Sequence, residues 1–230
     1  MIKNNIFGFL SVLFLLCNLS FIKAQKVYTT SGGELILQSG QIEKNNESFN
    51  TNVRLTWWFH SNEHLHVDII KNAGLFTGFA IRNIGFITDE DELKIKYRSY
   101  SLGLPLAIKI GSLPKNFFIY GGAEYEWLFH FKQKVFVEGE KRKYSEWLSN
   151  RTQRFIPSLF AGVQFPGGLN LKFRYYLDDF LNHSYHGSSE FSDFRNFTKT
   201  QLWTVSMSYQ MKNSRIKKEV KERSKYFVSL

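Results

Sequence analysis

The sequence predicts an all-β fold: a transmembrane, antiparallel up-and-down β-barrel of eight strands, whose polar lumen is filled by side chains. The hairpin 154–178 shows the pattern most clearly, because its second arm alternates apolar residues such as Phe173 with charged residues such as Arg174. Successive side chains of a strand point to opposite faces, so this arm has one apolar face and one charged face. A soluble sheet with one wet side would show the same alternation.

The lengths of the connections favour the membrane barrel over the soluble sheet. Short turns at 61–63, 111–116 and 166–168 alternate with long loops at 138–150 and 180–198 and with intermediate polar ones at 43–48 and 89–92. In an up-and-down barrel this places all short turns on one side, as in outer-membrane barrels. No stretch after residue 24 is long and apolar enough for a transmembrane helix, whereas about 9–11 residues suffice for a spanning strand.

The chain begins with a predicted secretory signal peptide, residues 1–24. Lys3 supplies the positive start, 6–16 the apolar run, and Ala24 the small residue before cleavage. A lipoprotein signal ending at Cys17 is the alternative, but the bulky Leu16 precedes that cysteine. Cys17 is the single cysteine of the chain, so the mature protein is expected to have no disulfide and no thiol chemistry.

The barrel itself is predicted to occupy residues 25–211. We expect strands at about 34–42, 50–60, 64–88, 93–110, 117–137, 154–165, 169–178 and 200–211. The segment 64–88 keeps one phase throughout and is interpreted as one strand, which gives the even count of single-chain bacterial barrels; a turn at 72–74 would instead divide it. Pro105 lacks a ladder donor, which predicts a bulge or local edge there. In 117–137 the odd positions, up to Phe131, are expected to form the outer face.

The two faces of the strands differ in chemistry. Five aromatic residues are predicted to face lipid: Trp57, Phe79, Trp127, Phe173 and Trp203. Seven charged residues are predicted to form a polar network in the lumen: Arg54, Arg82, Glu124, Glu126, Lys172, Arg174 and Asp178. Eight strands leave an interior just wide enough for side chains, and unpaired buried charges are costly. We therefore expect ion pairs that plug the lumen; a narrow polar channel is the alternative.

Lys and Arg exceed Asp and Glu by ten in the whole chain. Basic residues of the strands alternate with apolar ones instead of forming a stripe, so no nucleic-acid partner is expected. Part of the excess lies in residues 212–230, a predicted basic tail. Because eight strands that begin inside also end inside, both termini are expected in the periplasm. The tail is interpreted as solvated and frayed; the alternative is a contact with an acidic partner, anionic headgroups or the cell wall.

Four segments carry a family resemblance: Ser-Gly-Gly-Glu at 31–34, Gly-Leu-Pro-Leu at 103–106, Tyr-Gly-Gly-Ala-Glu at 120–124 and Phe-Arg-Tyr-Tyr-Leu at 173–177. In these segments and in its alternation over about 25–211, the chain resembles the small outer-membrane β-barrel proteins of Bacteroidota-type Gram-negative bacteria. The resemblance implies the fold and a location in the cell outer membrane. It also implies a link to secretion and gliding machinery for some relatives.

Two groups of residues are candidates for chemistry. His64, His66 and Asp68 share one strand face with spacing that could hold zinc, but no second cluster accompanies them, so no metal and no cofactor are predicted. His183 and His186 lie near three serines, as a lipid hydrolase or acyltransferase would require: Ser184, Ser188 and Ser189. Nothing in the sequence positions a base against a nucleophile, so no catalytic residue is predicted.

The sequence therefore favours a non-enzymatic outer-membrane protein with a structural or partner-binding role. The alternative is a lipid-modifying enzyme of the acyltransferase or lipase type, or a narrow polar channel. The expected partners are outer-membrane lipid or lipopolysaccharide, and an envelope protein that binds through the loops 138–150 and 180–198 or through the tail 212–230.

Overall fold

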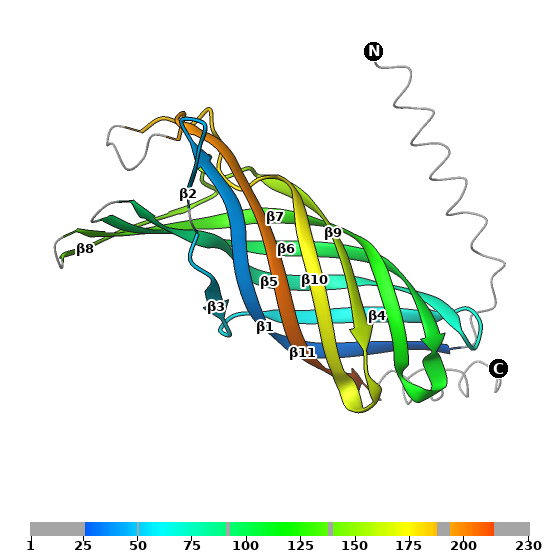
Figure 1. Cartoon of the computed structure of the whole chain (residues 1–230). Helices are drawn as coiled ribbons and strands as arrows, with labels where there is room; N and C mark the ends of the chain where they lie inside the picture. Colours follow the sequence, from blue (N-terminus) through cyan, green and yellow to red (C-terminus); the bar gives the residue numbers. More distant parts are fainter. Residues whose placement is uncertain (1–25, 50, 91–92, 138–139, 188–193, 214–230) are drawn as a thin grey trace, which may run out of the picture.

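The computed structural model of the chain describes residues 26–49, 51–90, 93–137, 140–187 and 194–213. Its strands, labelled in Figure 1, are β1 (Lys26–Lys44), β2 (Glu47–Phe49), β3 (Arg54–Thr56), β4 (Ser61–Asp68), β5 (Ala73–Glu90), β6 (Leu93–Ser112), β7 (Phe117–Val137), β8 (Glu140–Trp147), β9 (Phe155–Gln164), β10 (Leu169–Asp179) and β11 (Phe197–Asn213). Two short 3-10 helices, η2 (Leu113–Lys115) and η3 (Pro166–Gly168), form turns. None of the described residues forms a helix that is long and apolar enough to span a bilayer.

Eight of these strands close into a ring, which confirms the predicted antiparallel up-and-down barrel. The ring order is β1, β4, β5, β6, β7, β9, β10 and β11, and each strand pairs antiparallel with its neighbour. β11 returns to β1 along a ladder that runs from Thr29 opposite Asn213 to Lys44 opposite Phe197. Closure gives both edges of each ring strand a partner, which satisfies backbone groups where lipid would offer none.

The prediction of one strand over 64–88 is wrong, because this segment belongs to two strands, β4 and β5. The amides of Ile69 and Ile70 both donate to the carbonyl of Ala73, at 3.1 and 3.0 Å, and close a turn at 69–72. Asp68 pairs with Gly74, so the paired residues have the same parity and the phase passes through the turn unbroken. Unbroken phase therefore cannot distinguish one long strand from this kind of hairpin.

Two neighbouring predictions also need correction. Residues 61–63 are not a turn but the beginning of β4, and of the predicted strand 50–60 only β3 forms, paired with β1 at Ile36–Gln38. The total of eight is nevertheless right, because one predicted strand is lost from the ring and another is gained. Near Pro105 the β5–β6 ladder passes from Leu106 to Gly103 without pairing the residues between, as expected for a local edge.

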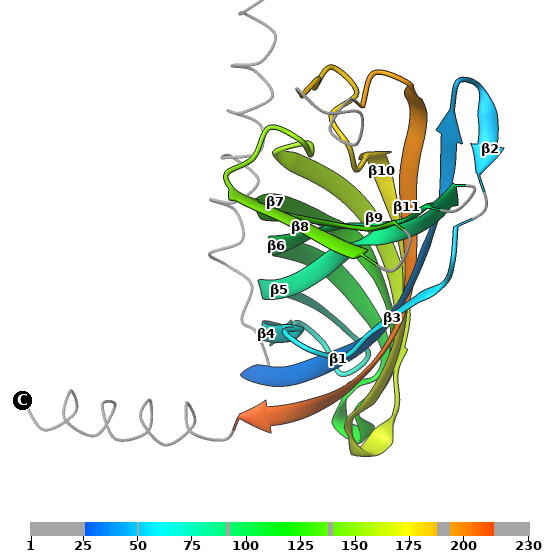
Figure 2. The same cartoon turned by 90° about the vertical axis from the view of Figure 1, so that its left-hand side faces the viewer.

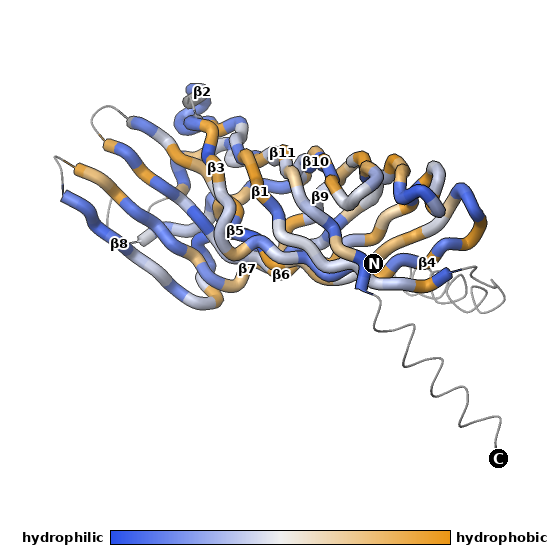
Figure 3. Tube along the Cα trace, turned by 90° about the horizontal axis from the view of Figure 1, so that it is seen from below, coloured by the Kyte–Doolittle hydropathy of each residue, from blue (hydrophilic) through white to orange (hydrophobic). Residues whose placement is uncertain are grey.

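The outer surface of the ring is apolar, and hydropathy alternates along each strand (Figure 3). Large apolar side chains are exposed all around it: Leu37, Leu65, Phe79, Ile81, Leu104, Leu106, Ile108, Ile110, Ile119, Tyr125, Phe155, Leu159, Leu171, Phe173, Val205 and Met207. Of the five aromatic residues predicted on this face, Trp57, Phe79, Trp127 and Phe173 are exposed, and Trp203 stacks on Phe173 with ring centroids 6.5 Å apart. Soluble monomers rarely expose an apolar surface of this extent.

The two ends of the barrel differ. The turn end carries the connections 69–72, 113–116 and 165–168, together with the first residue of β1 and the last of β11. At the loop end the connections from β1 to β4 and from β10 to β11 are long, as predicted, but only two residues separate β5 from β6, and the predicted loop 138–150 contains β8, which pairs with β7 over His130–Val137. We call the flap the sheet formed by 83–90 of β5, 93–100 of β6, 130–137 of β7 and β8; it extends past the ring (Figures 1 and 2).

One irregularity fixes which residues face outward on the flap. Between Tyr100 and Ser101 the β6–β7 ladder skips Phe129, so β7 carries one extra residue there. The extra residue reverses the parity of β7 beyond it, and Phe131 turns inward with 1% exposure. The prediction that the outer face of 117–137 extends to Phe131 is therefore wrong at Phe131.

The lumen is apolar towards the loop end. A buried cluster fills it there: Ile42, Ile84, Phe86, Ile95, Tyr97, Leu128, Phe131, Val135, Ile156, Tyr176, Phe180, Leu181, Phe194, Phe197 and Leu202. Phe180, Leu181 and Phe194 come from the connection between β10 and β11 and are 0% exposed. This connection therefore closes the lumen at the loop end.

Candidate functional site

Six charged side chains meet in the middle of the lumen, and we call them the lumen network: Glu34 of β1, Arg82 of β5, Glu124 and Glu126 of β7, and Lys172 and Arg174 of β10. Each lies on the inward-facing parity of its strand, opposite the exposed apolar residues. The side chains are between 0% and 7% exposed. Three carboxylates face three cations, so the network is neutral as a whole.

The two arginines bridge the carboxylates. Arg174 contacts Glu124 through Nη2 and Glu126 through Nη1, both at 2.5 Å. Arg82 contacts Glu124 through Nη1, which is 3.4 Å from Glu126, while its Nε lies 3.2 Å from Glu34. Lys172 completes the network with an ion pair to Glu34 at 2.5 Å. Each carboxylate therefore contacts two cations.

Neutral side chains satisfy further positions of the network. Ser101 and Tyr176 donate to Glu126 at 2.5 and 3.0 Å. Asn62 donates to Glu34 at 3.0 Å, and Arg174 also donates to Ser158 at 3.1 Å. Buried charges are tolerable where they are paired and hydrogen-bonded in this way. The arrangement blocks the lumen with fixed side chains.

The structure brings together five of the seven residues that the sequence assigned to the lumen: Arg82, Glu124, Glu126, Lys172 and Arg174. Arg54 is buried but donates instead to Asn83 and Gln38, at 2.7 and 3.5 Å. Asp178 is exposed, because the β10–β11 ladder shifts between Tyr175 and Asp179 and breaks the alternation. These two assignments to the network need correction.

Sequence reasoning missed Glu34. Leu35 and Leu37 share one face of their strand, which leaves Glu34 on the opposite, inward face. Parity could therefore have found it, and it is 4% exposed in the structure. Its omission mattered, because without Glu34 the lumen would hold an excess of cations.

A second polar cluster lies nearer the turn end, around the buried Lys109. Its Nζ is 2.6 Å from Asp68, and 3.1 Å from both the Tyr28 hydroxyl and Nδ1 of His66. The other ring nitrogen of His66 bonds Thr30 at 3.0 Å. Both nitrogens of His66 are thus engaged, which does not suit a zinc ligand. No group of three metal-ligating side chains occurs among the residues that the structure describes.

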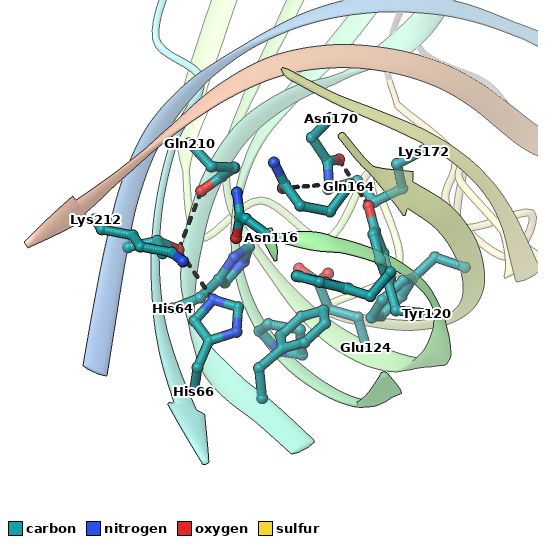
Figure 4. A pocket seen from close by; sticks show the side chains of 15 residues that line it. His64, His66, Asn116, Tyr120, Glu124, Gln164, Asn170, Lys172, Gln210 and Lys212 are labelled. Carbon is teal, nitrogen blue, oxygen red and sulfur yellow. Dashed lines mark hydrogen bonds between the residues drawn. The ribbon is translucent and has the colours of Figure 1, made fainter. Parts of the chain in front are cut away.

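A cavity lies between the lumen network and the turn end (Figure 4). His64 and His66 of β4, Tyr120 of β7, Asn170 of β10 and Gln210 of β11 point into it. Its empty volume is about 510 Å³ including the mouth, but only about 20 Å³ can hold the centre of a water molecule. A site for one water molecule needs roughly 10–15 Å³ of such volume. The cavity therefore holds very few waters and no sizeable ligand.

Among the described residues, the serine and histidine residues considered for catalysis do not form a catalytic pair. His183 contacts Thr200 at 3.2 Å and lies 4.0 Å from Asp179. Thr200 is 0% exposed and its hydroxyl also accepts from the amide of Leu181. A buried, engaged hydroxyl cannot reach a substrate; the three residues hold the β10–β11 connection instead. Within the part of the chain that the structure describes, Ser184 and His186 have no contact of this kind; Ser188 and Ser189 lie outside it.

No protein-family model matches the sequence, and no curated protein matches it. Solved structures give weak likenesses. Ail, the attachment invasion locus protein of Yersinia pestis, is 16% identical over 80% of this chain and 99% of that chain, with a TM-score of 0.36. Neisserial surface protein A is 11% identical over 80% and 96%, with a TM-score of 0.39. The outer membrane protein OprG from Pseudomonas aeruginosa is 12% identical over 82% and 97%, with a TM-score of 0.38. The fold assignment rests on the strand pairings of this chain.

Proposed function

We propose that the chain is an integral outer-membrane β-barrel protein with a closed lumen and a non-enzymatic, structural or partner-binding role. The observation that carries the proposal is the combination of an apolar outer wall with a neutral, fully paired lumen network. The wall suits a lipid solvent, and the network removes the lumen as a route for solutes.

The outer wall supports the membrane location energetically. On β6, four alternating residues, Leu104, Leu106, Ile108 and Ile110, are 54–63% exposed. Burying a Leu or Ile side chain fully is worth about 1.5–3 kcal/mol. Exposing such residues on all eight strands to water would cost more than the usual stability of a domain, about 5–15 kcal/mol. A hydrocarbon solvent removes this cost.

The lumen argues against conduction. An ion entering from the turn end would meet the lumen network, whose charges already have partners. An ion entering from the loop end would meet Phe180, Leu181 and Phe194, which are 0% exposed. Dehydrating an ion against an apolar cluster is costly. Because the lumen is closed, a partner would have to bind outside it, and the loop end of the barrel is the part available for such a contact.

We place the turn end, and with it both termini, in the periplasm, because short turns lie there in bacterial barrels. Residues 1–25 and 214–230 lie outside the described residues, so the signal peptide and most of the basic tail remain sequence predictions. β11 continues to Asn213, which moves the proposed beginning of the tail from 212 to 214. The loop end would then present the flap and residues 182–187 to the cell surface.

Cell fractionation tests the location. The mature chain should be recovered from outer membranes only with detergent, and unboiled samples should migrate differently from boiled ones in gels, as closed barrels do. Recovery as a soluble periplasmic protein would refute the proposal. Crosslinking in intact cells tests the partner role; reproducible recovery of secretion components would support the secretion link that the family resemblance implies.

A further inference from the structure

The outer face of the flap carries a dense group of cations. Seven of them lie on one face of three paired strands: Lys94, Lys96 and Arg98 of β6, Lys132 and Lys134 of β7, and Lys141 and Lys143 of β8. Residues opposite each other in a ladder share a face. The opposite face of the same sheet packs into the apolar cluster through Ile95, Tyr97 and Val135. The cations therefore point away from the lumen.

These cations repel one another in the ladder. Lys96 pairs with Lys134, which pairs with Lys143, so three ammonium groups form one row across three strands. Arg98 pairs with Lys132 in the next row. Like charges that lie directly opposite each other destabilise a sheet. A sheet that contains two such rows is stabilised either by other interactions or by an anion that binds between the opposed cations.

Carboxylates do not neutralise the two rows within the described part of the flap. Asp89 pairs with Lys94 at 3.7 Å, and Glu140 and Glu146 lie on the opposite parity of β8. Aromatic rings accompany the cations instead. Lys132 lies over the ring of Tyr100 at 5.1 Å, and Lys96 lies over that of Phe136 at 5.2 Å.

The position of the rows relative to the barrel wall identifies what they face. The row below them is aromatic: Tyr100 pairs with His130, which pairs with Trp147, and the last two rings stack with centroids 4.1 Å apart. Below this row the same face of β6 continues into the exposed apolar residues Leu104 and Leu106. Aromatic girdles mark the interfaces of membrane barrels. Successive rows are about 7 Å apart along the strand, which places the cations at the headgroup layer.

We propose that the outer face of the flap binds the phosphate groups of anionic lipid headgroups in the membrane leaflet at the loop end. This inference rests on the proposed membrane location. Ammonium and guanidinium groups bind phosphate through charge-assisted hydrogen bonds, and a phosphate between opposed cations relieves their repulsion. The face continues the lipid-facing wall and therefore looks sideways across the leaflet, which favours headgroups over polyanions in solution.

Native mass spectrometry of the full mature protein in a neutral detergent tests the proposal. The probes are diphosphoryl lipid A, phosphatidylcholine and the soluble polyanion inositol hexakisphosphate. The row variant replaces three cations with glutamine: Lys96→Gln, Lys134→Gln and Lys143→Gln. The control variant makes the same change of charge elsewhere: Lys71→Gln, Lys115→Gln and Lys199→Gln. An arginine version of the row keeps the charge and the site: Lys96→Arg, Lys134→Arg and Lys143→Arg.

The row variant should bind lipid A at least about tenfold more weakly than the wild type. The control and arginine variants should stay within about threefold of it, and all should bind phosphatidylcholine alike. In lipid-free detergent the row variant should melt at the same or a higher temperature, because its opposed charges are gone. A merely structural role for the lysines would instead lower the melting temperature and leave lipid A affinity unchanged.

Two results would overturn the proposal. One is a row variant that binds lipid A like the control; the other is wild-type protein that binds inositol hexakisphosphate as tightly as lipid A, which would assign the face to soluble polyanions. Membrane recovery and heat-dependent gel mobility are measured on the same samples. Failure of lipid A binding in a membrane-recovered barrel removes this inference alone, whereas a soluble wild-type protein removes the proposed function as well.

Discussion

Replacing Arg174 with methionine probes the lumen network at its most connected member. The change keeps most of the side-chain volume and removes the guanidinium that contacts Glu124 and Glu126, both at 2.5 Å. It also leaves the Ser158 hydroxyl without its donor at 3.1 Å. The lumen then holds three carboxylates and two cations. Arg82 alone remains to compensate the two carboxylates of β7.

The expected loss follows from leaving buried carboxylates with too few partners. Removing one member of a buried ion pair costs about 3–5 kcal/mol. A second change, Glu126→Gln, should recover part of this loss in the double variant, because two carboxylates then face two cations. In the wild type Ser101 donates to Oε2 of Glu126 and Tyr176 to Oε1, so the amide oxygen of the introduced glutamine can still accept from one of them while its amide nitrogen faces the hydroxyl oxygen of the other. We expect a coupling of about 1–3 kcal/mol between the two changes.

Urea unfolding in lipid vesicles, followed by tryptophan fluorescence and by heat-dependent gel mobility, measures these losses. The matched control is Arg142→Met in the flap, where the wild-type residue pairs with Glu140 at 3.9 Å and is 70% exposed. This control should change stability by less than about 0.5 kcal/mol. The reasoning is refuted if Arg174→Met loses no more than the control, or if the double variant loses the sum of the two single losses.

Three further outcomes are expected. Leu106→Arg, on the outer wall, should lower the stability of the barrel in lipid vesicles by about 2–4 kcal/mol, and an unchanged urea midpoint would argue against lipid contact there. Gly103→Ala should cost about 1–3 kcal/mol in the same assay, because a methyl group at this position would collide with the Glu124 carboxylate; a neutral result would show that the lumen network can shift. A cleavable tag after Leu230 should survive protease added to intact cells, since β11 ends at the turn end with Asn213 opposite Thr29, and cutting of the tag would reverse the orientation.

Strand parity made much of the site predictable from the sequence. Whether a side chain points inward depends only on its own strand, so Arg82, Lys172 and Arg174 could be placed in the lumen without knowing their neighbours. The same local rule failed where the ladder slips. Asp178 follows a register shift on β10, and Phe131 follows the extra residue on β7. Such slips depend on the partner strand, and no signal in a single strand reveals them.

The flap could not be predicted for a related reason. Alternating lysines in 94–98, 132–134 and 141–143 resemble three separate solvated segments in the sequence. They form one cationic surface only because the strand register sets Lys96 beside Lys134, and Lys134 beside Lys143. That register is a property of three strands and of the hairpin between β7 and β8, a segment that the sequence indicated only as a loop.

The distribution of charge separates two kinds of cation in this chain. In the lumen network three cations meet three carboxylates, because a buried charge without a partner costs several kcal/mol. The lumen network therefore contributes nothing to the excess of ten positive charges. The flap contributes to that excess, and so do residues 212–230, which carry seven basic side chains against two acidic ones. Outside the barrel, water and salt screen such an excess of positive charge, but they do not pair the cations with a specific anion. Within the described part of the flap no carboxylate lies in either row of opposed cations, and the phosphates of the adjoining leaflet are the partner that we propose for them.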